Sequence, residues 1–289
     1  IGTPPNALLA GFLRSSHGIS IGFMQWMEIG LPLVIIALPI LFVVMTKVVF
    51  PISHDFQIAK KDSIRQQLKA LGSMTAPERR VGIIVLLTAV AWVARPYLSN
   101  YINGLSDTGI AIGCAIVLFA MPSGENQKKR LLVWDDCIKL PWEILILFGG
   151  GLSLAKNITA SGLAEWIANQ ATILDGVPLL VLMLLLSLSI IFLTEISSNT
   201  ATAATFIPLL YAIAISLDIN PYMMVIPATL ATSCAFMLPV ATPPNAIAYS
   251  SGEIRIQDMV KAGFWLNLIM TVIAVLVSYT LIPLLFDLY

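Results

Sequence analysis

The stretch VATPPNAIAYSSG at residues 240–252 contains Thr242-Pro243-Pro244-Asn245, and the chain opens on nearly the same text, IGTPPNALLAG at residues 1–11. Both copies lie in otherwise apolar sequence that is expected to be helical. A proline inside a helix removes a backbone hydrogen bond and clashes with the preceding turn, at a cost of about 3 kcal/mol. Two prolines in succession therefore predict an unwound segment. In an apolar chain such a break is tolerated only against protein or a wet cavity.

The composition around these copies indicates a membrane protein. Hydrophobic residues make up 58% of the chain and charged residues 11%, and the mean hydropathy is +0.89. Soluble domains carry roughly twice that charged fraction. Apolar windows lie at residues 29–45, 81–94, 109–121, 142–155, 177–193, 201–217, 223–240 and 260–285, and a helix needs about 20 residues to cross a bilayer. We predict an all-α polytopic membrane protein in the cell's inner (plasma) membrane.

Several function classes are disfavoured by the same residues. The net charge is zero and no basic block is interleaved with aromatics, which argues against a nucleic-acid partner. The three cysteines are scattered and odd in number, so we expect Cys114, Cys137 and Cys234 to be packing thiols. His17 and His54 fall in expected loops, which leaves no His, Asp or Cys constellation for an enzyme. The chain starts inside the first copy, and we expect an N-terminal half to precede it.

Lysine and arginine positions predict the sidedness of the spans. Most of the 16 cationic residues fall in three expected loops, around residues 47–80, 128–139 and 255–261, and the positive-inside rule makes these loops cytoplasmic. The connections at 97–106 and 216–221 then face outward, and residues 60–80 are expected to form a solvated linker. Asn103, Asp107 and Asp175 are expected to be loop residues.

The link at residues 194–205, TEISSNTATAAT, joins two apolar windows, 177–193 and 201–217, that together start at one outer-facing point and end at another. It contains no lysine or arginine, although a cytoplasmic turn usually carries some. Either both windows cross the membrane fully or they form a re-entrant helical hairpin with this link as its tip, and we favour the hairpin. Residues 157–171 are expected to lie in the interface as an amphipathic helix, with Leu163, Trp166 and Ile167 opposite Glu165 and Asn169.

The residues after the two Thr-Pro-Pro-Asn copies also match each other. Ile21-x-Phe23 and then Gly30 come after the first copy, and Ile254-x-Ile256 and then Gly263 come after the second. By the charge argument the first copy leads outward and the second inward. Equivalent segments that run in opposite directions form an inverted repeat, which in secondary transporters places broken helices and the binding site near the membrane midplane. The alternative is a pair of proline kinks that serve packing alone.

The predicted site is built from neutral oxygen and amide groups. Hydroxyls and freed carbonyls suit a small hard cation, and helix N-termini suit an anion. No lysine or arginine is available at this depth, so a co-bound cation would offset the charge of an anion. Glu195 is the one nearby carboxylate. It could ligate a cation or carry a proton, or equally it could be a structural brace.

SSNTATAATFIPL at residues 197–209, together with ATPPN and GTPPN, resembles the divalent anion/sodium symporter family of Na+-coupled dicarboxylate, citrate and sulfate carriers. The resemblance covers essentially the whole chain, as the C-terminal part of such a carrier. It implies a homodimer with a scaffold and an elevator-type transport domain, and two hairpins, of which the first would precede Ile1. It implies substrate contacts at Ser198, Asn199, Thr200, Thr242, Pro243, Thr3 and Pro4. It implies one sodium among Thr194, Ser197, Asn199 and the Ala241 carbonyl, and another that involves Gly2.

We therefore predict a secondary transporter for a di- or tricarboxylate, driven by sodium, and not an enzyme or a channel; Na+ is expected as the co-transported ion, with no organic cofactor. An anion exchanger of the same fold without sodium coupling is the alternative. The transport domain is expected to comprise residues 1–28, 173–217 and 218–289, and the scaffold residues 29–172. The choice among succinate, malate, citrate and sulfate stays open.

Overall fold

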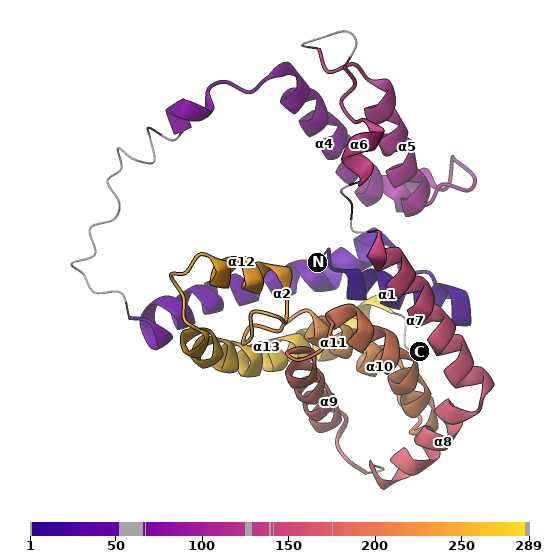
Figure 1. Cartoon of the computed structure of the whole chain (residues 1–289). Helices are drawn as coiled ribbons and strands as arrows, with labels where there is room; N and C mark the ends of the chain where they lie inside the picture. The colour runs from indigo at the N-terminus through magenta and orange to yellow at the C-terminus, as the bar shows by residue number, and fades with distance from the viewer. Residues whose placement is uncertain are drawn as a thin grey trace. The chain divides into compact units, whose positions relative to one another are not determined.

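The computed structural model describes residues 2–51, 66, 68–124, 129–138, 140, 142–174 and 176–286, and these are mainly helical (Figure 1). The first helices are α1 (Pro4–His17), α2 (Phe23–Val43), the π-helical turn η1 (Val44–Val49), α4 (Ala76–Leu98), α5 (Asp107–Ala120) and α6 (Trp134–Ile138). They are followed by α7 (Glu143–Ala160), α8 (Leu163–Gln170), the 3-10 turn η2 (Ala171–Leu174), α9 (Leu179–Thr194), α10 (Asn199–Ser216), α11 (Tyr222–Thr232), α12 (Pro243–Ser250) and α13 (Ile256–Leu285).

Among the described residues, four helices are long and apolar enough to cross a membrane: Phe23–Val49, Ala76–Leu98, Asn199–Ser216 and Ile256–Leu285. Four shorter apolar helices accompany them: Asp107–Ala120, Leu145–Ala160, Leu179–Thr194 and Tyr222–Thr232. Much of their apolar surface is uncovered; Leu86 on α4 is 63% exposed and Ile35 on α2 is 61% exposed. Apolar surface of this extent marks faces that meet lipid or other protein. The length and composition of these helices agree with the predicted integral, multi-pass membrane protein.

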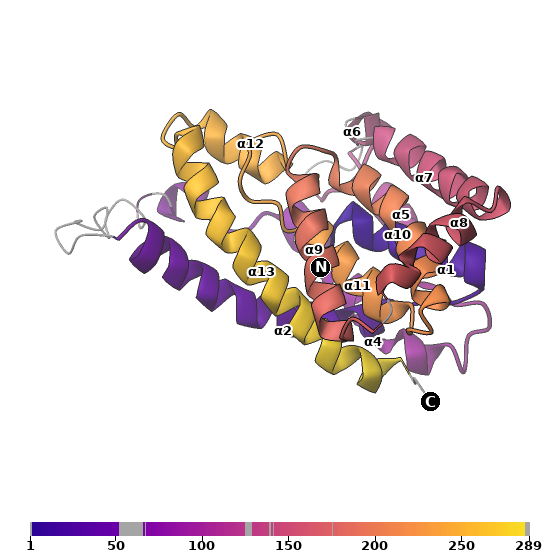
Figure 2. The same cartoon turned by 90° about the horizontal axis from the view of Figure 1, so that it is seen from below.

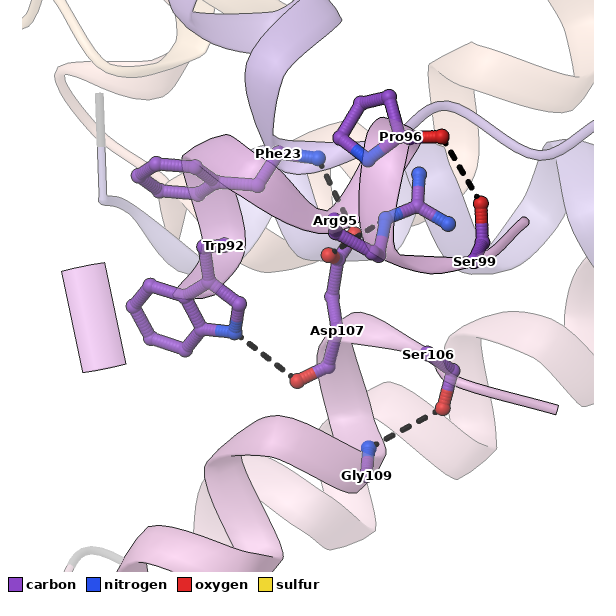
Figure 3. Close-up of polar contacts among 8 residues, drawn as sticks. All are labelled: Phe23, Trp92, Arg95, Pro96, Ser99, Ser106, Asp107 and Gly109. Carbon is purple, nitrogen blue, oxygen red and sulfur yellow. Dashed lines mark hydrogen bonds and ion pairs between the residues drawn. The ribbon is translucent and has the colours of Figure 1, made fainter. Parts of the chain in front are cut away.

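The chain forms two compact units. The smaller unit comprises residues 22–24 and 52–141 and contains α4, α5 and α6. Figure 3 shows its polar centre, where the Arg95 guanidinium pairs with the Asp107 carboxylate at 2.8 Å. The backbone N–H of Phe23 donates to the same carboxylate at 3.1 Å, and Trp92 Nε1 donates to the Asp107 carbonyl at 3.0 Å. Asp107 is thus not a loop residue, because it begins α5 and holds that helix to the end of α4.

The larger unit comprises residues 1–21, 25–51 and 142–289 and is organised around α11. Every residue of α11 from Met223 to Thr232 is buried, as expected for a helix that is apolar all round. α11 packs against α9, α10, α13 and α1. α2 and α13 run alongside each other (Figure 2), and Val44 and Val49 of η1 pack against Ala262 and Leu266 of α13.

Several helix boundaries differ from the predicted ones. The window 223–240 is helical only to Thr232, after which residues 233–242 form a non-helical connection that leads to α12. The predicted linker at 60–80 is too long, because α4 begins at Ala76, where Thr75 and Glu78 form a capping box. Residues 60–65 and 67 of that linker lie outside the described residues.

Two further expectations are corrected in the larger unit. Residues 157–171 do not form one interfacial helix: α7 extends to Ala160, and α8 starts afresh after Gly162, whose positive φ of 74° ends the preceding turn. His17 is not in a loop, because it is the last residue of α1. His54 and Asp175 lie outside the described residues, whereas Asn103 is in the turn between α4 and α5, as predicted.

Candidate functional site

The turn between α9 and α10 presents the serine-rich segment at the start of α10. Ser198 is the N-cap of α10, and its side chain accepts a hydrogen bond from the Ala201 N–H at 3.5 Å. Ser197 donates to the Leu193 carbonyl at 2.9 Å and pairs with the Thr202 hydroxyl at 2.7 Å. Ser, Asn and Thr favour such caps because their side chains replace the missing backbone partners. The sequence therefore ends one helix and starts the next here.

Thr194 links this turn to the end of α11. Its side chain is fully buried and donates to Asn199 Oδ1 at 2.5 Å, with the Thr232 carbonyl oxygen at 3.5 Å as a second, longer contact. One hydroxyl, one amide oxygen and one main-chain carbonyl are thus gathered in a buried place. These are uncharged hard oxygens, the ligand type that small hard cations prefer.

The first copy reaches the same end of α11. The Thr3 hydroxyl lies 2.8 Å from the Ser233 hydroxyl, across 230 residues of sequence. Thr3 is the N-cap of α1 and Pro4 and Pro5 occupy its first turn, so the prolines start a helix instead of interrupting one. Thr232 and Ser233 therefore meet, respectively, the α9–α10 turn and the first copy.

The second copy holds the connection that leaves α11. Thr242 is the N-cap of α12 and accepts a hydrogen bond from the Asn245 N–H at 3.3 Å. Asn245 Nδ2 donates to the carbonyls of Ala235 and Leu238, each at 3.0 Å. The side-chain amide of Asn245 therefore binds the connection that precedes α12. Pro243 is exposed at the start of α12.

Glu195 braces this connection from the other side. The residue is 3% exposed, and its carboxylate accepts hydrogen bonds from the N–H groups of Met237 and Leu238, at 2.9 and 3.0 Å. Asn267 Nδ2 on α13 donates to it at 2.7 Å, and Asn267 Oδ1 accepts from the Phe236 N–H at 3.2 Å. Of the two roles left open by the sequence, this geometry is that of a brace.

A glycine lets the connection approach α13. A Cβ atom built on Gly263 would lie 2.4 Å from the carbonyl carbon and oxygen of Phe236 and 2.5 Å from the Cα of Met237. Real Cβ atoms do not come this close to backbone, so no other residue fits without a shift. Gly263 stands one turn before Asn267, and both present the same face of α13 to the connection.

The structure brings together part of the predicted sodium set. Thr194 and Asn199 are in direct contact, whereas the hydrogen bonds of Ser197 go to Leu193 and Thr202, and Ala241 donates its N–H to the Leu238 carbonyl at 3.2 Å. Among the other predicted residues, Thr200 is buried, Gly2 and Ser198 are exposed, and Thr3, Pro4 and Thr242 are half-buried. No group of three or more His, Cys, Asp or Glu side chains gathers within the described parts of the chain.

Sequence reasoning missed Thr232, Ser233 and Asn267. Asn267 could have been found, because an asparagine within a long apolar helix is costly unless its side chain has a partner. The structure has it fully buried in the 30-residue α13. Thr232 and Ser233 form a short polar interruption inside a window that was read as continuous helix. That interruption marked the end of α11.

Comparisons with known proteins bear on the family of the chain. Residues 1–288 match the family described as "Sodium:sulfate symporter transmembrane region". The chain is 41% identical over 289 residues to a "Sodium-dependent dicarboxylate transporter SdcS" of Staphylococcus saprophyticus, and 38% identical over 287 residues to the protein of that name from Staphylococcus aureus strain USA300. Each alignment covers 98% of this chain and 55% of the relative, so the chain spans about half the length of these curated relatives.

This chain belongs to the sodium:sulfate symporter family, the divalent anion/sodium symporters that its motifs resemble, which is a family of membrane transporters and not of enzymes.

Proposed function

We propose that the protein is a secondary active transporter that carries a di- or tricarboxylate of the succinate, malate and citrate class across the cytoplasmic membrane together with Na+. The observation that supports this most is the convergence of three segments on the end of α11 and the non-helical connection that follows it, residues 232–242. Thr194 at the end of α9 contacts Thr232, Thr3 of the first copy contacts Ser233, and Asn245 of the second copy binds the connection itself.

The cation would be held by uncharged oxygens. In this proposal Thr194, Ser197, Asn199 and the Ala241 carbonyl contribute to one sodium site, and the Thr232 carbonyl is added to that set because of its place beside Thr194. A second sodium would involve Gly2. A monovalent cation needs no carboxylate among its ligands, which leaves Glu195 free to hold the connection in place.

The substrate would bind at helix N-termini. α1, α10 and α12 begin at or beside residues proposed to contact it: Thr3, Pro4, Ser198, Asn199, Thr200, Thr242 and Pro243. The unsatisfied N–H groups and the helix dipole at an N-terminus favour carboxylate oxygens. These dipoles only partly balance the negative charge of the substrate, and the bound sodium offsets the rest. The binding of sodium and the binding of substrate are therefore coupled.

The transport cycle and the assembly belong to the same proposal. We propose a homodimer in which residues 29–172 form the scaffold, while residues 1–28, 173–217 and 218–289 move through the membrane as an elevator. The α9–α10 pair would be the re-entrant hairpin of the second half of an inverted repeat. The lengths of α9 and α10, 16 and 18 residues, are at the short end of what a full crossing needs, and tilt would lengthen that need, so they support the hairpin.

The proposal is tested with Asn199→Ala in the full-length protein, reconstituted in proteoliposomes. We expect sodium-driven succinate uptake to fall by at least about tenfold, because the change removes a ligand oxygen and the partner of Thr194. Asn157→Ala is the matched control, because Asn157 is exposed on α7 and bonds only its own helix at the Ser153 carbonyl. Uptake that persists in Asn199→Ala contradicts the site. If the unmodified protein shows succinate counterflow that does not depend on sodium, it is an exchanger instead.

A further inference from the structure

A cavity of about 290 Å³ lies in the larger unit, lined by residues of α1, α7, α8 and α10. Its size suits a small organic molecule. None of the residues proposed to bind sodium or carboxylate lines it. Its lining includes the aromatic side chains of Phe12, His17 and Tyr211 and, from α8, Glu165 and Asn169.

The three aromatic side chains form an ordered cluster. The His17 ring stacks on Tyr211 with centroids 3.8 Å apart and an interplanar angle of 19°. The Phe12 ring meets both of them edge-on, at 5.2 Å from His17 and 5.8 Å from Tyr211. Partial burial lowers the pKa of His17, which favours the uncharged ring. Aromatic faces of this kind attract cations.

The negative charge of the lining comes from α8. Glu165 is the one formally charged residue among those that line the cavity, and its side chain lies at the exposed side of the cavity. Arg14 on α1 and Lys156 on α7, the cationic residues of the lining helices, are not part of the lining. α8 presents its polar side to the cavity, whereas Leu163 and Trp166 point away and are 43% and 61% exposed. A carboxylate that lines the same cavity as an aromatic cluster suits a cation that has an apolar body.

The cavity also lies at the far ends of the two helices that start at the proposed substrate site. α1 begins at Pro4 and ends at His17, and α10 begins at Asn199 and carries Tyr211 in its last two turns. α7 packs tightly against both, since a Cβ on Gly151 would lie 2.7 Å from the Ala204 Cβ and 3.3 Å from Leu8 Cδ1. A molecule in the cavity would therefore touch α1, α8 and α10.

We propose that this cavity binds an organic ammonium with an apolar body, whose charge is held by Glu165 and whose body lies against Phe12, His17 and Tyr211. The bound molecule ties α1 and α10 to α8. If the proposed division holds, α8 belongs to the scaffold and α1 and α10 belong to the transport domain. The bound molecule then links the two domains and slows transport without competing for the substrate. That second consequence rests on the proposed function; the binding site does not.

Binding is tested by calorimetry with 2-phenylethylammonium on the full-length protein in phosphatidylglycerol nanodiscs. We expect saturable binding that phenylacetate, an anion of similar size, does not reproduce. Glu165→Gln should weaken it roughly tenfold or more, because it removes the charged partner. Glu253→Gln removes an exposed carboxylate elsewhere and should leave the affinity unchanged. Equal affinity in Glu165→Gln, equal binding of phenylacetate, or no binding at millimolar concentration overturns the proposal.

Two further arms identify the source of the ammonium and its effect. If the natural ligand is a lipid headgroup, phosphatidylethanolamine in the nanodiscs will compete with 2-phenylethylammonium and weaken its apparent affinity. If the natural ligand is a soluble amine, the affinity will be unchanged. Either result supports an ammonium site. In proteoliposomes the amine should lower the maximal rate of succinate uptake and leave KM unchanged. A maximal rate that the amine does not change overturns the proposed link between scaffold and transport domain. Absent uptake in the unmodified protein would contradict the proposed function while the calorimetry still decides the site.

Discussion

The two Thr-Pro-Pro-Asn copies have the same local structure and different surroundings. In each, threonine is the N-cap in extended conformation, with φ and ψ of −115° and 151° at Thr3 and −144° and 151° at Thr242, and proline begins the helix. The first copy starts a 14-residue helix with Leu8, Leu9 and Leu13 in the core. The second starts an eight-residue helix with no buried residue.

The hydrogen bonds of the two threonines show the same contrast. The Thr242 hydroxyl accepts from a backbone N–H of its own helix, whereas the Thr3 hydroxyl bonds Ser233 on a distant segment. The tetrapeptide thus dictates how a helix begins, and the surroundings decide what its side chains hold. The first copy is fixed by its packed helix; the second depends on a braced connection. Removing the brace should therefore affect the second copy far more than the first.

The largest effect is expected from Glu195→Ala. The change leaves the N–H groups of Met237 and Leu238 and the Asn267 amide without their acceptor, each of them in a part-buried or buried bond. We expect a loss of about 3–5 kcal/mol in the free energy of unfolding. Thermal unfolding of the purified full-length protein in detergent measures it, with the exposed Glu253→Ala as control. A midpoint equal to that of the control would mean that the connection needs no brace.

A smaller loss is expected from Gly263→Ala. The added Cβ meets the backbone of Phe236 and Met237 at 2.4–2.5 Å, and backbone cannot move aside as a flexible side chain can. We expect the free energy of unfolding to fall by about 2–3 kcal/mol. The matched control is Gly149→Ala on α7, where a Cβ meets nothing within 4 Å, and where alanine should stabilise the helix slightly. The same thermal unfolding assay applies, and equal behaviour of the two variants would argue against the close approach.

The smallest effects separate the two threonines. Thr3→Ala and Thr242→Ala should each cost about 1 kcal/mol, the first through a tertiary hydrogen bond and the second through a helix cap. Combination with Ser233→Ala distinguishes them, because residues that share a bond are not additive. We expect Thr3 and Ser233 to be coupled and Thr242 and Ser233 to be additive. Coupling for both pairs, or for neither, would remove the difference between the copies.

Much of the fold could be predicted from the sequence, because its signals are local. Long apolar windows predicted the helices, but the two Thr-Pro-Pro-Asn copies were predicted to interrupt helices, whereas they begin α1 and α12. The end of α11 at Thr232 was missed, since two small polar residues interrupt hydrophobicity only briefly. The start of α5 at Asp107 was missed although Ser106 caps it locally, and the pairing of Asp107 with Arg95 of another helix had no sequence signal.

The site was predictable as a set of segments and not as a set of contacts. The motifs indicated that the two copies and the α9–α10 turn belong together. Pairs such as Thr3 with Ser233, or Glu195 with Asn267, join residues that are 230 and 72 positions apart and have no periodic or spacing signal. The polar face of α8, with Glu165 and Asn169, was predicted, but the cavity that it lines was not.

The proposed site depends on the first copy meeting the end of α11, and engineered disulfide formation tests this contact directly. In the full-length protein in membranes, with Cys114, Cys137 and Cys234 replaced by serine or alanine, Thr3→Cys and Ser233→Cys are combined. Labelling of each single variant with a small maleimide first shows that both thiols react. Because the two hydroxyls are 2.8 Å apart, we predict that mild oxidation crosslinks the pair, and that Thr3→Cys with Ser251→Cys stays reduced. A Thr3–Ser233 pair that reacts with maleimide but never crosslinks would contradict the convergence of these segments.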